Sequence, residues 1–334
     1  MKKLQVGLIG CGVMGRSLGE SLAAVEGAKL VKVCDVAEDA AAKLGQDLGV
    51  SHATDLEAVL SQKAVDAVII ATPPFLHRPV CEAAAAAGKH IFVEKPLAAT
   101  VEDCDAIIGA AAKASVTLMV GFVCRYHAIH RQVKQMVDEG QIGTPLYVFV
   151  YRIRRKLQGV WNQPWRRSRR QSGGWLMEIN AHEIDFMRQV SGEVKSVFAA
   201  GGTYLHHEAD FPDMTVVTLK FASGAVGLLH SSAVSAIGGS GGRVDGTEGA
   251  LEFKFKGEGA GIHYKCADRD PAFMALADLP GPDPVAAELG AWVTAIADEA
   301  EPPCTGSDGR AAVAIAQGAY ESVETGKQVE LGAA

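Results

Sequence analysis

The sequence predicts an α/β fold of two domains: a doubly wound parallel sheet, followed by an α+β domain with a large open, mostly antiparallel sheet. Three observations predict it. The chain has 334 residues, which suits two domains. Strand-like and helical runs alternate as far as Gly121, and such alternation is typical of parallel sheets. Beyond that point strand-like runs follow one another directly, which indicates antiparallel pairing. We therefore expect domains at residues 1–121 and 122–334.

The chain opens with a strand, a glycine-rich loop and a helix. Residues 4–9 are a β-rich run, Gly10 to Gly15 reads GCGVMG, and residues 16–24 have a helical pattern. In a G-x-G-x-x-G loop the first glycine permits a tight turn, the second lets the backbone approach a pyrophosphate, and the third lets helix and strand pack closely. The helix N-terminus would face the phosphates. We expect dinucleotide contacts from Gly10, Gly12, Val13, Met14 and Gly15; an ordinary glycine-rich turn is the alternative.

Asp35 supports the dinucleotide interpretation. It ends the next predicted strand, residues 30–34, and lies about 20 residues beyond the last glycine, where a carboxylate accepts hydrogen bonds from the adenosine ribose. The same charge repels a 2′-phosphate, and Val36 and Ala37 offer no cation to bind one. The sequence therefore favours NAD over NADP.

The rest of the first domain continues the alternation. Strands are predicted at residues 65–71, 90–94 and 116–120, and helices at 78–87 and 100–114. Thr100 and Asp103 resemble a capping box. Ligands of such sheets bind at the carboxyl ends of the strands. These ends carry the glycine loop, Asp35, residues 71–74 and residues 94–96, so we expect four loops to converge on one cleft.

The second domain is predicted to begin with a helix at residues 127–138. The strand-like runs follow at 146–153, 194–200, 214–221, 226–235 and 251–255. Residues 222–225 are typical of a hairpin turn. The run GGSGG at 238–242 indicates a mobile loop or a solvated hairpin tip. Two late helices are expected at 285–300 and 308–325, the second ended by Gly326.

Residues 173–187, GGWLMEINAHEIDFM, place polar groups in an apolar run. A single helix would bring Glu178, His182 and Asp185 onto one face. A structural histidine bonded to a neighbour is the simplest interpretation of His182 taken alone. A metal site is possible by spacing, but no second histidine cluster accompanies it, and we expect no metal.

A basic stretch at residues 152–170 is the other unusual feature. Its cations are interleaved with Trp161 and Trp165: Arg152, Arg154, Arg155, Lys156, Arg166, Arg167, Arg169 and Arg170. Two interpretations stay open. The stretch is a solvated or subunit-contact loop, or some of its cations bind an anionic sugar through bidentate arginine contacts.

Composition excludes several classes of function. The net charge of −7 argues against nucleic acid as a partner. No run approaches the ~18 apolar residues of a membrane span, and the first 15 residues lack a cleavage site for a signal peptide. The seven cysteines are odd in number and lack C-x-x-C spacing, which favours reduced thiols. We expect a cytoplasmic protein with a small-molecule substrate.

Together these motifs resemble the glucose–fructose oxidoreductase/inositol dehydrogenase (Gfo/Idh/MocA) family over almost the whole chain. The segments that carry the resemblance are GLIGCGVMG, ATPPFLH, GKHIFVEKPLA, GFVCRY, GGWLMEINAHEID, FASGAVG, GTEGAL and SDGRAAVAIAQGAYESVETG. The resemblance implies a Rossmann domain followed by an open sheet that often packs in dimers or tetramers, here a homodimer or homotetramer. It also implies NAD(P)-dependent hydride transfer at a carbinol carbon of a sugar, cyclic polyol or sugar acid.

The resemblance also implies the site residues. Lys95 of the EKP segment and His182 would flank the reacting carbon, with Glu178 in support. The sequence departs from the family pattern at two points: the acid one turn before the histidine is usually aspartate and here is Glu178, and Gly-x-His is commoner than Asn180-Ala181-His182. Further cofactor contacts are expected from Thr72, Pro73, His77, Glu94 and Lys95. Substrate contacts are expected from Arg125, Trp165, Arg166, Glu178 and His182.

The chemistry of these groups suits alcohol oxidation. A histidine, with an ordinary pKa of ~6.5, can accept the hydroxyl proton near neutral pH. Lys95 would stabilise the developing alkoxide. Glu178 could hold a second hydroxyl, and Asp185 would orient His182 if the imidazole faces away from Glu178. Two alternatives stay open: a lyase or glycoside-cleaving enzyme that uses transient oxidation by NAD, and a non-catalytic NAD-binding regulator.

Overall fold

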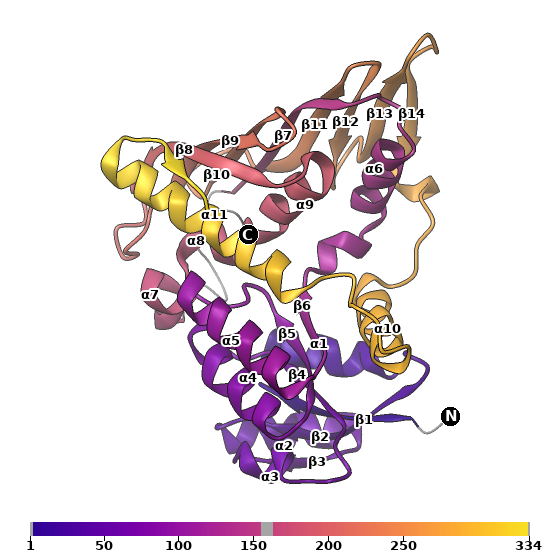
Figure 1. Cartoon of the computed structure of the whole chain (residues 1–334), viewed down its shortest axis with the longest axis vertical. Helices are drawn as coiled ribbons and strands as arrows, with labels where there is room; N and C mark the ends of the chain where they lie inside the picture. Colours follow the sequence, from indigo (N-terminus) through magenta and orange to yellow (C-terminus); the bar gives the residue numbers. More distant parts are fainter. Residues whose placement is uncertain (1–2, 155–162, 333–334) are drawn as a thin grey trace. The chain divides into compact units, whose positions relative to one another are not determined.

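The computed structural model describes residues 3–154 and 163–332 (Figure 1). The chain forms two compact units, one of residues 1–123 with 282–310, the other of residues 124–281 with 311–334. The alternation in the sequence predicts one boundary after Gly121 and leaves everything beyond it to the second domain. The structure instead returns residues 282–310 to the first unit.

The first unit is built on a parallel six-stranded sheet with the order β3-β2-β1-β4-β5-β6. This is the doubly wound order of dinucleotide-binding folds, as predicted. The strands are β1 (Leu4–Ile9), β2 (Ala28–Cys34), β3 (Ser51–Ala53), β4 (Ala67–Ile70), β5 (His90–Glu94) and β6 (Leu118–Gly121). The helices are α1 (Val13–Leu22), α2 (Glu38–Leu48), α3 (Glu57–Leu60), η1 (Pro74–Leu76), α4 (His77–Ala86), α5 (Val101–Ala114) and α10 (Pro284–Ala297).

Local sequence explains the boundaries of these helices. The Thr100 side chain accepts a hydrogen bond from the Asp103 N–H at 3.1 Å and caps α5, which confirms half of the predicted capping box. Helix α4 packs against α5, and α1 packs against α10. Trp292 of α10 is fully buried, with its ring edge toward Phe92 at a centroid distance of 5.8 Å. This apolar anchor is why the late segment belongs to the first unit.

The second unit is built on a nine-stranded sheet with the order β14-β13-β12-β11-β7-β10-β9-β8-β15. Its neighbouring strands are antiparallel except β7 and β10, which run parallel. The strands are β7 (Pro145–Ile153), β8 (Val194–Gly202), β9 (Met214–Phe221), β10 (Val226–Ser232), β11 (Gly239–Gly246), β12 (Gly249–Lys254), β13 (Gly261–Cys266), β14 (Ala272–Ala275) and β15 (Val329–Glu330). The predicted open, mostly antiparallel sheet is confirmed.

The glycine run at 238–242 is not a mobile loop or a hairpin tip. Residues 239–242 of the run lie in β11, which pairs with β7 on one side and β12 on the other. A Cβ atom on Gly241 would lie 2.3 Å from the Phe253 carbonyl oxygen, and one on Gly242 would lie 2.2 Å from that of Phe149. Glycine permits this close backbone approach, so the run belongs to a central strand.

Helices cover one face of this sheet (Figure 1). They are α6 (Ala128–Asp138), α9 (Ala181–Ser191) and α11 (Gly306–Thr325), of which residues 311–325 belong to this unit. Helix α9 packs on β7 and β10, and the Ser322 hydroxyl of α11 accepts a hydrogen bond from the Ala199 N–H of β8 at 2.9 Å. Within residues 163–332, no helix is both long and apolar enough to span a membrane.

The opposite face of the sheet carries exposed apolar side chains. Phe198, Val216 and Val226, from β8, β9 and β10, are 41%, 37% and 42% exposed. Phe198 lies opposite Thr218, which is two residues from Val216 in β9 and so points the same way. Val216 in turn lies opposite His230, which is four residues from Val226 in β10. The three apolar side chains therefore share one face of the sheet. An apolar patch on an open sheet is typical of a surface that contacts another protein.

His130 of α6 makes the core of the second unit sensitive to acid. Its ring stacks on Phe255 at 4.2 Å between centroids and meets Phe186 edge-on, and no hydrogen-bond partner of either nitrogen is found among the described residues. Burial lowers the pKa of His130 from 6.5 to about 3. The unfolded chain therefore binds a proton at pH values where the folded chain does not, and stability falls as the pH drops from 6.5 toward 3.

We expect His130→Phe to remove this dependence. At pH 5 the neutral ring costs the wild type about 2 kcal/mol of free energy of unfolding, and the variant avoids that loss. Urea unfolding at pH 5 and pH 7.5 measures the effect. The stability of the variant relative to wild type should increase on going to pH 5. An unchanged difference between the two pH values would contradict the assignment.

Candidate active site

The glycine loop forms an open cradle at the carboxyl end of β1. Gly10 has a φ of 98°, and a Cβ there would lie 2.7 Å from the Ala71 carbonyl group. A Cβ on Gly15 would lie 1.8 Å from the Gly10 oxygen. Around Gly12, by contrast, a Cβ would have no atom within 4 Å among the described residues other than those of its neighbours along the chain. Gly12 precedes α1, whose first residues Val13 and Met14 are exposed. The cradle fits a pyrophosphate against backbone N–H groups.

Asp35 is oriented toward the same cradle by two backbone groups. One carboxylate oxygen accepts a hydrogen bond from the Cys11 N–H at 2.7 Å, and the other accepts one from the Ala37 N–H at 2.9 Å. Each oxygen keeps a lone pair for a ribose hydroxyl. Burial, reinforced by Asp35, raises the pKa of Cys11 to about 12, so its thiol is uncharged and would not repel a phosphate bound in the cradle. The residues present fit an adenine dinucleotide.

His77 joins the two remaining loops of the first unit. Its ring is fully buried, with Nε2 2.9 Å from the Thr72 oxygen and Nδ1 3.0 and 3.2 Å from the Pro96 and Leu97 oxygens. Burial lowers the pKa of this histidine. Both ring nitrogens face backbone carbonyls, so His77 holds the Thr72–Pro73 loop to the Lys95 loop.

Four loops thus meet at one edge of the sheet, as predicted. Gly10 contacts Ala71, Asp35 contacts Cys11, and His77 links Thr72 to the segment after Lys95. Glu94 ends β5, and its carboxylate accepts a hydrogen bond from the Lys95 N–H at 3.1 Å. Lys95 therefore follows directly on a buried strand of the first unit.

In the second unit, residues 173–187 form two helices, and the prediction of a single helix is wrong. Helix α8 (Gly174–Glu178) ends at the acid, and α9 begins at Ala181. Asn180 lies at the break. Its side-chain oxygen accepts a hydrogen bond from the Ser231 hydroxyl at 2.5 Å, and its amide donates to Glu183 at 3.2 Å. These buried bonds replace helical continuity, so Glu178 and His182 lie on different helices.

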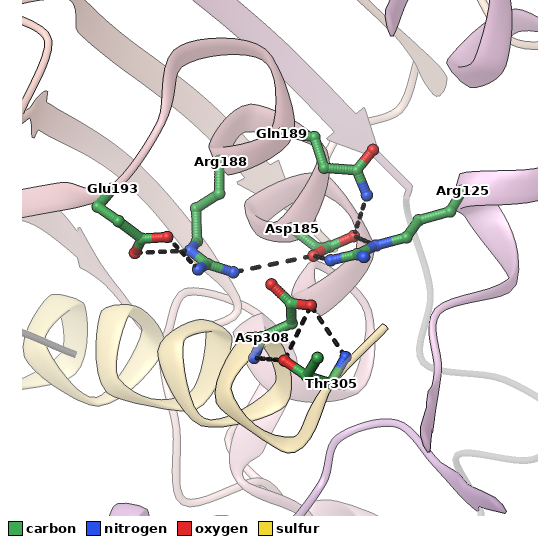
Figure 2. A network of polar contacts seen from close by, with 7 residues as sticks. All are labelled: Arg125, Asp185, Arg188, Gln189, Glu193, Thr305 and Asp308. Atoms are coloured by element: carbon green, nitrogen blue, oxygen red, sulfur yellow. Dashed lines mark hydrogen bonds and ion pairs between the residues drawn. The ribbon is translucent and has the colours of Figure 1, made fainter. Parts of the chain in front are cut away.

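Asp185 pairs with Arg125 (Figure 2). The guanidinium Nε lies 2.7 Å from one carboxylate oxygen and Nη2 lies 2.5 Å from the other, while the Gln189 amide donates at 3.0 Å. Arg188 lies 4.0 Å from Asp185 and also pairs with Glu193. Asp185, expected to orient His182, and Arg125, expected to bind substrate, thus bind each other. The same figure draws a separate contact of the first unit, in which Thr305 and Asp308 cap the start of α11.

Several cations of the basic stretch are also paired. Arg152 lies 2.6 Å from the fully buried carboxylate of Glu183. Arg166, in η4 (Pro164–Arg167), pairs with Glu178 and lies 4.3 Å from the centroid of the Trp165 ring. Arg169, in α7 (Arg169–Ser172), pairs with Glu324. The candidates Arg155, Lys156 and Trp161 lie outside the described residues. Carboxylates of the same chain therefore neutralise part of the positive charge of the predicted basic stretch.

The predicted site residues belong to both units. Lys95 and the cofactor residues are in the first unit, whereas Arg125, Trp165, Arg166, Glu178 and His182 are in the second. His182 is the second residue of α9 and is 8% exposed. Over residues 3–154 and 163–332, no cluster of side chains with metal-binding geometry occurs.

Fold and cradle define a dinucleotide-binding oxidoreductase, and comparison with known proteins agrees. The family described as "Oxidoreductase family, NAD-binding Rossmann fold" matches residues 4–122, and the "GFO/IDH/MocA C-terminal domain" matches residues 130–252. Myo-inositol 2-dehydrogenase of Thermotoga maritima is 30% identical over 336 residues, 98% of each chain. The chain therefore belongs to the Gfo/Idh/MocA oxidoreductase family, with NAD as the cofactor of its Rossmann domain.

Two further relatives bear on function. A levoglucosan dehydrogenase solved with NADH and levoglucosan superposes with a TM-score of 0.90 at 25% identity, over 99% of this chain and all of that one. A 2,7-anhydro-N-acetylneuraminate hydratase of Escherichia coli is 31% identical over 235 residues, which span 68% of this chain and 61% of the relative.

Proposed function

We propose that this protein is an NAD-dependent dehydrogenase that oxidises or reduces a carbinol carbon of a sugar, cyclic polyol or sugar acid. The observation that carries the proposal is the arrangement of the first unit, in which a glycine cradle, an oriented Asp35 and the Lys95 loop meet at one sheet edge. A cationic side chain that follows directly on a strand of the same sheet, at the edge where the cradle lies, suits a reaction beside a bound nicotinamide. The family and the sugar and polyol dehydrogenases among its relatives support the substrate class.

The roles we propose follow from the charges of the side chains. NAD, when bound, supplies the hydride acceptor. His182 takes the proton of the hydroxyl, because a neutral imidazole is a good general base near neutral pH. Lys95 donates to the same oxygen and stabilises its developing negative charge. Glu178, together with Arg166 and Trp165, binds another part of the substrate.

The experiment that tests the function is a substrate panel. Purified protein is incubated with NAD, and in parallel with NADP, and neutral polyols, hexoses, amino sugars and uronates; NADH or NADPH absorbance is followed. We expect turnover of one group with NAD and much less with NADP, because Asp35 repels a 2′-phosphate. No change in absorbance with any substrate of the panel, although calorimetry shows that the protein binds NAD, would contradict the proposal of a dehydrogenase.

The relationship to a hydratase favours a second candidate. In that case the reaction would use transient oxidation by NAD to add or eliminate water, without net redox change. Product analysis by mass spectrometry separates the two. A product that differs from its substrate by one water, formed at constant NADH, would support the second candidate. A stable ketone formed in step with NADH would support the dehydrogenase.

We also propose that the protein is a cytoplasmic homodimer or homotetramer that associates through the open face of the nine-stranded sheet. The exposed Phe198, Val216 and Val226 support the interface, since an apolar patch on an open sheet needs cover. Within residues 3–154 and 163–332, which hold all seven cysteines, none of them forms a disulfide, and this suits a reducing compartment. Light scattering on the preparation used for the panel gives the mass; a monomer at every concentration would contradict the interface.

A further inference from the structure

Arg166 and Glu178 form a preassembled ion pair. Nη1 of Arg166 donates to Oε2 of Glu178, and the guanidinium lies 4.3 Å from the Trp165 ring centroid. The side chains are 21% and 5% exposed, so solvent screens their attraction only in part. Arg166 comes from η4 and Glu178 from the end of α8. The two opposite charges cancel, and the pair presents donors and acceptors without net charge.

We propose that this pair sets the charge of the substrate, an inference that rests on the proposed function, in which both residues contact it. A hydroxyl group can donate to Glu178 and accept from Arg166 without separating them. A substrate carboxylate must instead compete with Glu178 for the same planar donors, and the two anions repel each other. The pair therefore selects uncharged polyols and sugars over uronates, which narrows the substrate class proposed above by removing the sugar acids.

The contact with Trp165 should allow the substrate preference of this pair to be changed by a single substitution. The indole ring supports the guanidinium by a cation–π contact, which does not depend on Glu178. When the carboxylate is replaced by a neutral amide, Arg166 keeps its stacked orientation and its bidentate donors become available. Glu178→Gln should then convert a receptor for hydroxyl groups into a receptor for a carboxylate.

The test compares matched substrates that differ only in charge. The value of kcat/KM with NAD is measured for D-glucose against D-glucuronate and for D-galactose against D-galacturonate. Wild type should favour the neutral sugar in each pair. Glu178→Gln should shift the ratio toward the uronate by about tenfold or more. Arg166→Gln, which leaves Glu178 without this cation, should shift the ratio in the opposite direction.

Added salt provides a second readout. The uronate activity of Glu178→Gln should fall as ionic strength rises, since it depends on one attraction between unlike charges that solvent ions reach in part. The double variant Glu178→Gln/Arg166→Gln should lose the shift. A wild type that prefers uronates, or variants that lower both members of each pair equally, would overturn the proposal.

The chain offers a matched control in Arg169. This arginine also pairs with a glutamate, Glu324, and its guanidinium lies 4.5 Å from the centroid of an aromatic ring, that of Tyr320. Glu324→Gln should leave the neutral-to-uronate ratio unchanged. An equal shift in this variant would assign the effect to overall charge and overturn the proposal.

Failure of the proposed function is distinguishable from failure of the pair. If wild type oxidises no sugar, the dehydrogenase is wrong, yet calorimetric affinities of glucose and glucuronate in the presence of NAD still report charge selection. Opposite shifts in Glu178→Gln and Arg166→Gln would then support the pair. Identical affinity ratios in all variants would overturn it.

Discussion

Replacing His182 with glutamine is expected to lower kcat/KM by about 10²–10⁴-fold, the usual contribution of a general base. Lys95→Met should lower it by about 10²–10³-fold, as does loss of one donor to a developing oxyanion. Because we propose that both groups act on the same oxygen, the double variant should lose less than the product of the two factors. Steady-state rates with the best substrate of the panel measure all three.

The control for His182 is His207, an exposed histidine of the same unit. His207→Gln should keep wild-type kinetics. Calorimetry with NAD should show His182→Gln binding the cofactor with wild-type affinity, since the cradle lies in the first unit. If His182→Gln kept its activity to within threefold, histidine would not be the base and the assignment of α9 to catalysis would be wrong.

Arg152→Met is expected to be the most destabilising of the changes considered. It leaves the carboxylate of Glu183, which is fully buried, without the guanidinium 2.6 Å away. Breaking a buried pair from one side costs about 3–5 kcal/mol in the free energy of unfolding. Urea denaturation followed by circular dichroism measures the loss. The same pair supports the Asn180 junction, so His182 would also be displaced in this variant.

Two further variants make this prediction specific. Arg152→Met/Glu183→Leu removes both charges and should recover most of the lost stability, because no buried charge is left unpaired. Arg243 of β11 pairs with Asp245 at 2.7 Å on the exposed side, and Arg243→Met should cost less than about 1 kcal/mol. Equal losses at Arg152 and Arg243 would show that burial of Glu183 does not matter.

Local signals made the first unit predictable. The glycine loop, Asp35 at the end of β2 and the cap of Thr100 each depend on residues within one short segment, and the strands β1 and β5 agree with the sequence to the residue. The sequence does not mark β3, because a strand of three partly exposed residues is too short for a periodic pattern.

Long-range pairing limited the prediction of the second unit. Strand β11 is rich in glycine and becomes a strand only through partners on both sides, which no local pattern reveals. The contacts around His182 have the same character. Arg125 and Asp185 are 60 residues apart, and Asn180 and Ser231 are 51 apart. The residue types at the candidate site could be named from the sequence. The carboxylate that each arginine binds could not be predicted, because the partners are far apart along the chain.

Helix α10 belongs to the first unit although it is encoded after most of the second unit, and this affects the order in which the two units fold during translation. Trp292 packs against Phe92, and the Cys304 carbonyl accepts a hydrogen bond from the Val120 N–H at 3.1 Å. A ribosome must therefore synthesise eight of the nine strands of the second sheet, β7 to β14, before the Rossmann unit can close its core. Domains usually fold in the order of their synthesis. Here the cofactor-binding unit, although encoded first, is completed late, and we expect a nascent chain to gain full NAD affinity only after α10 has been made.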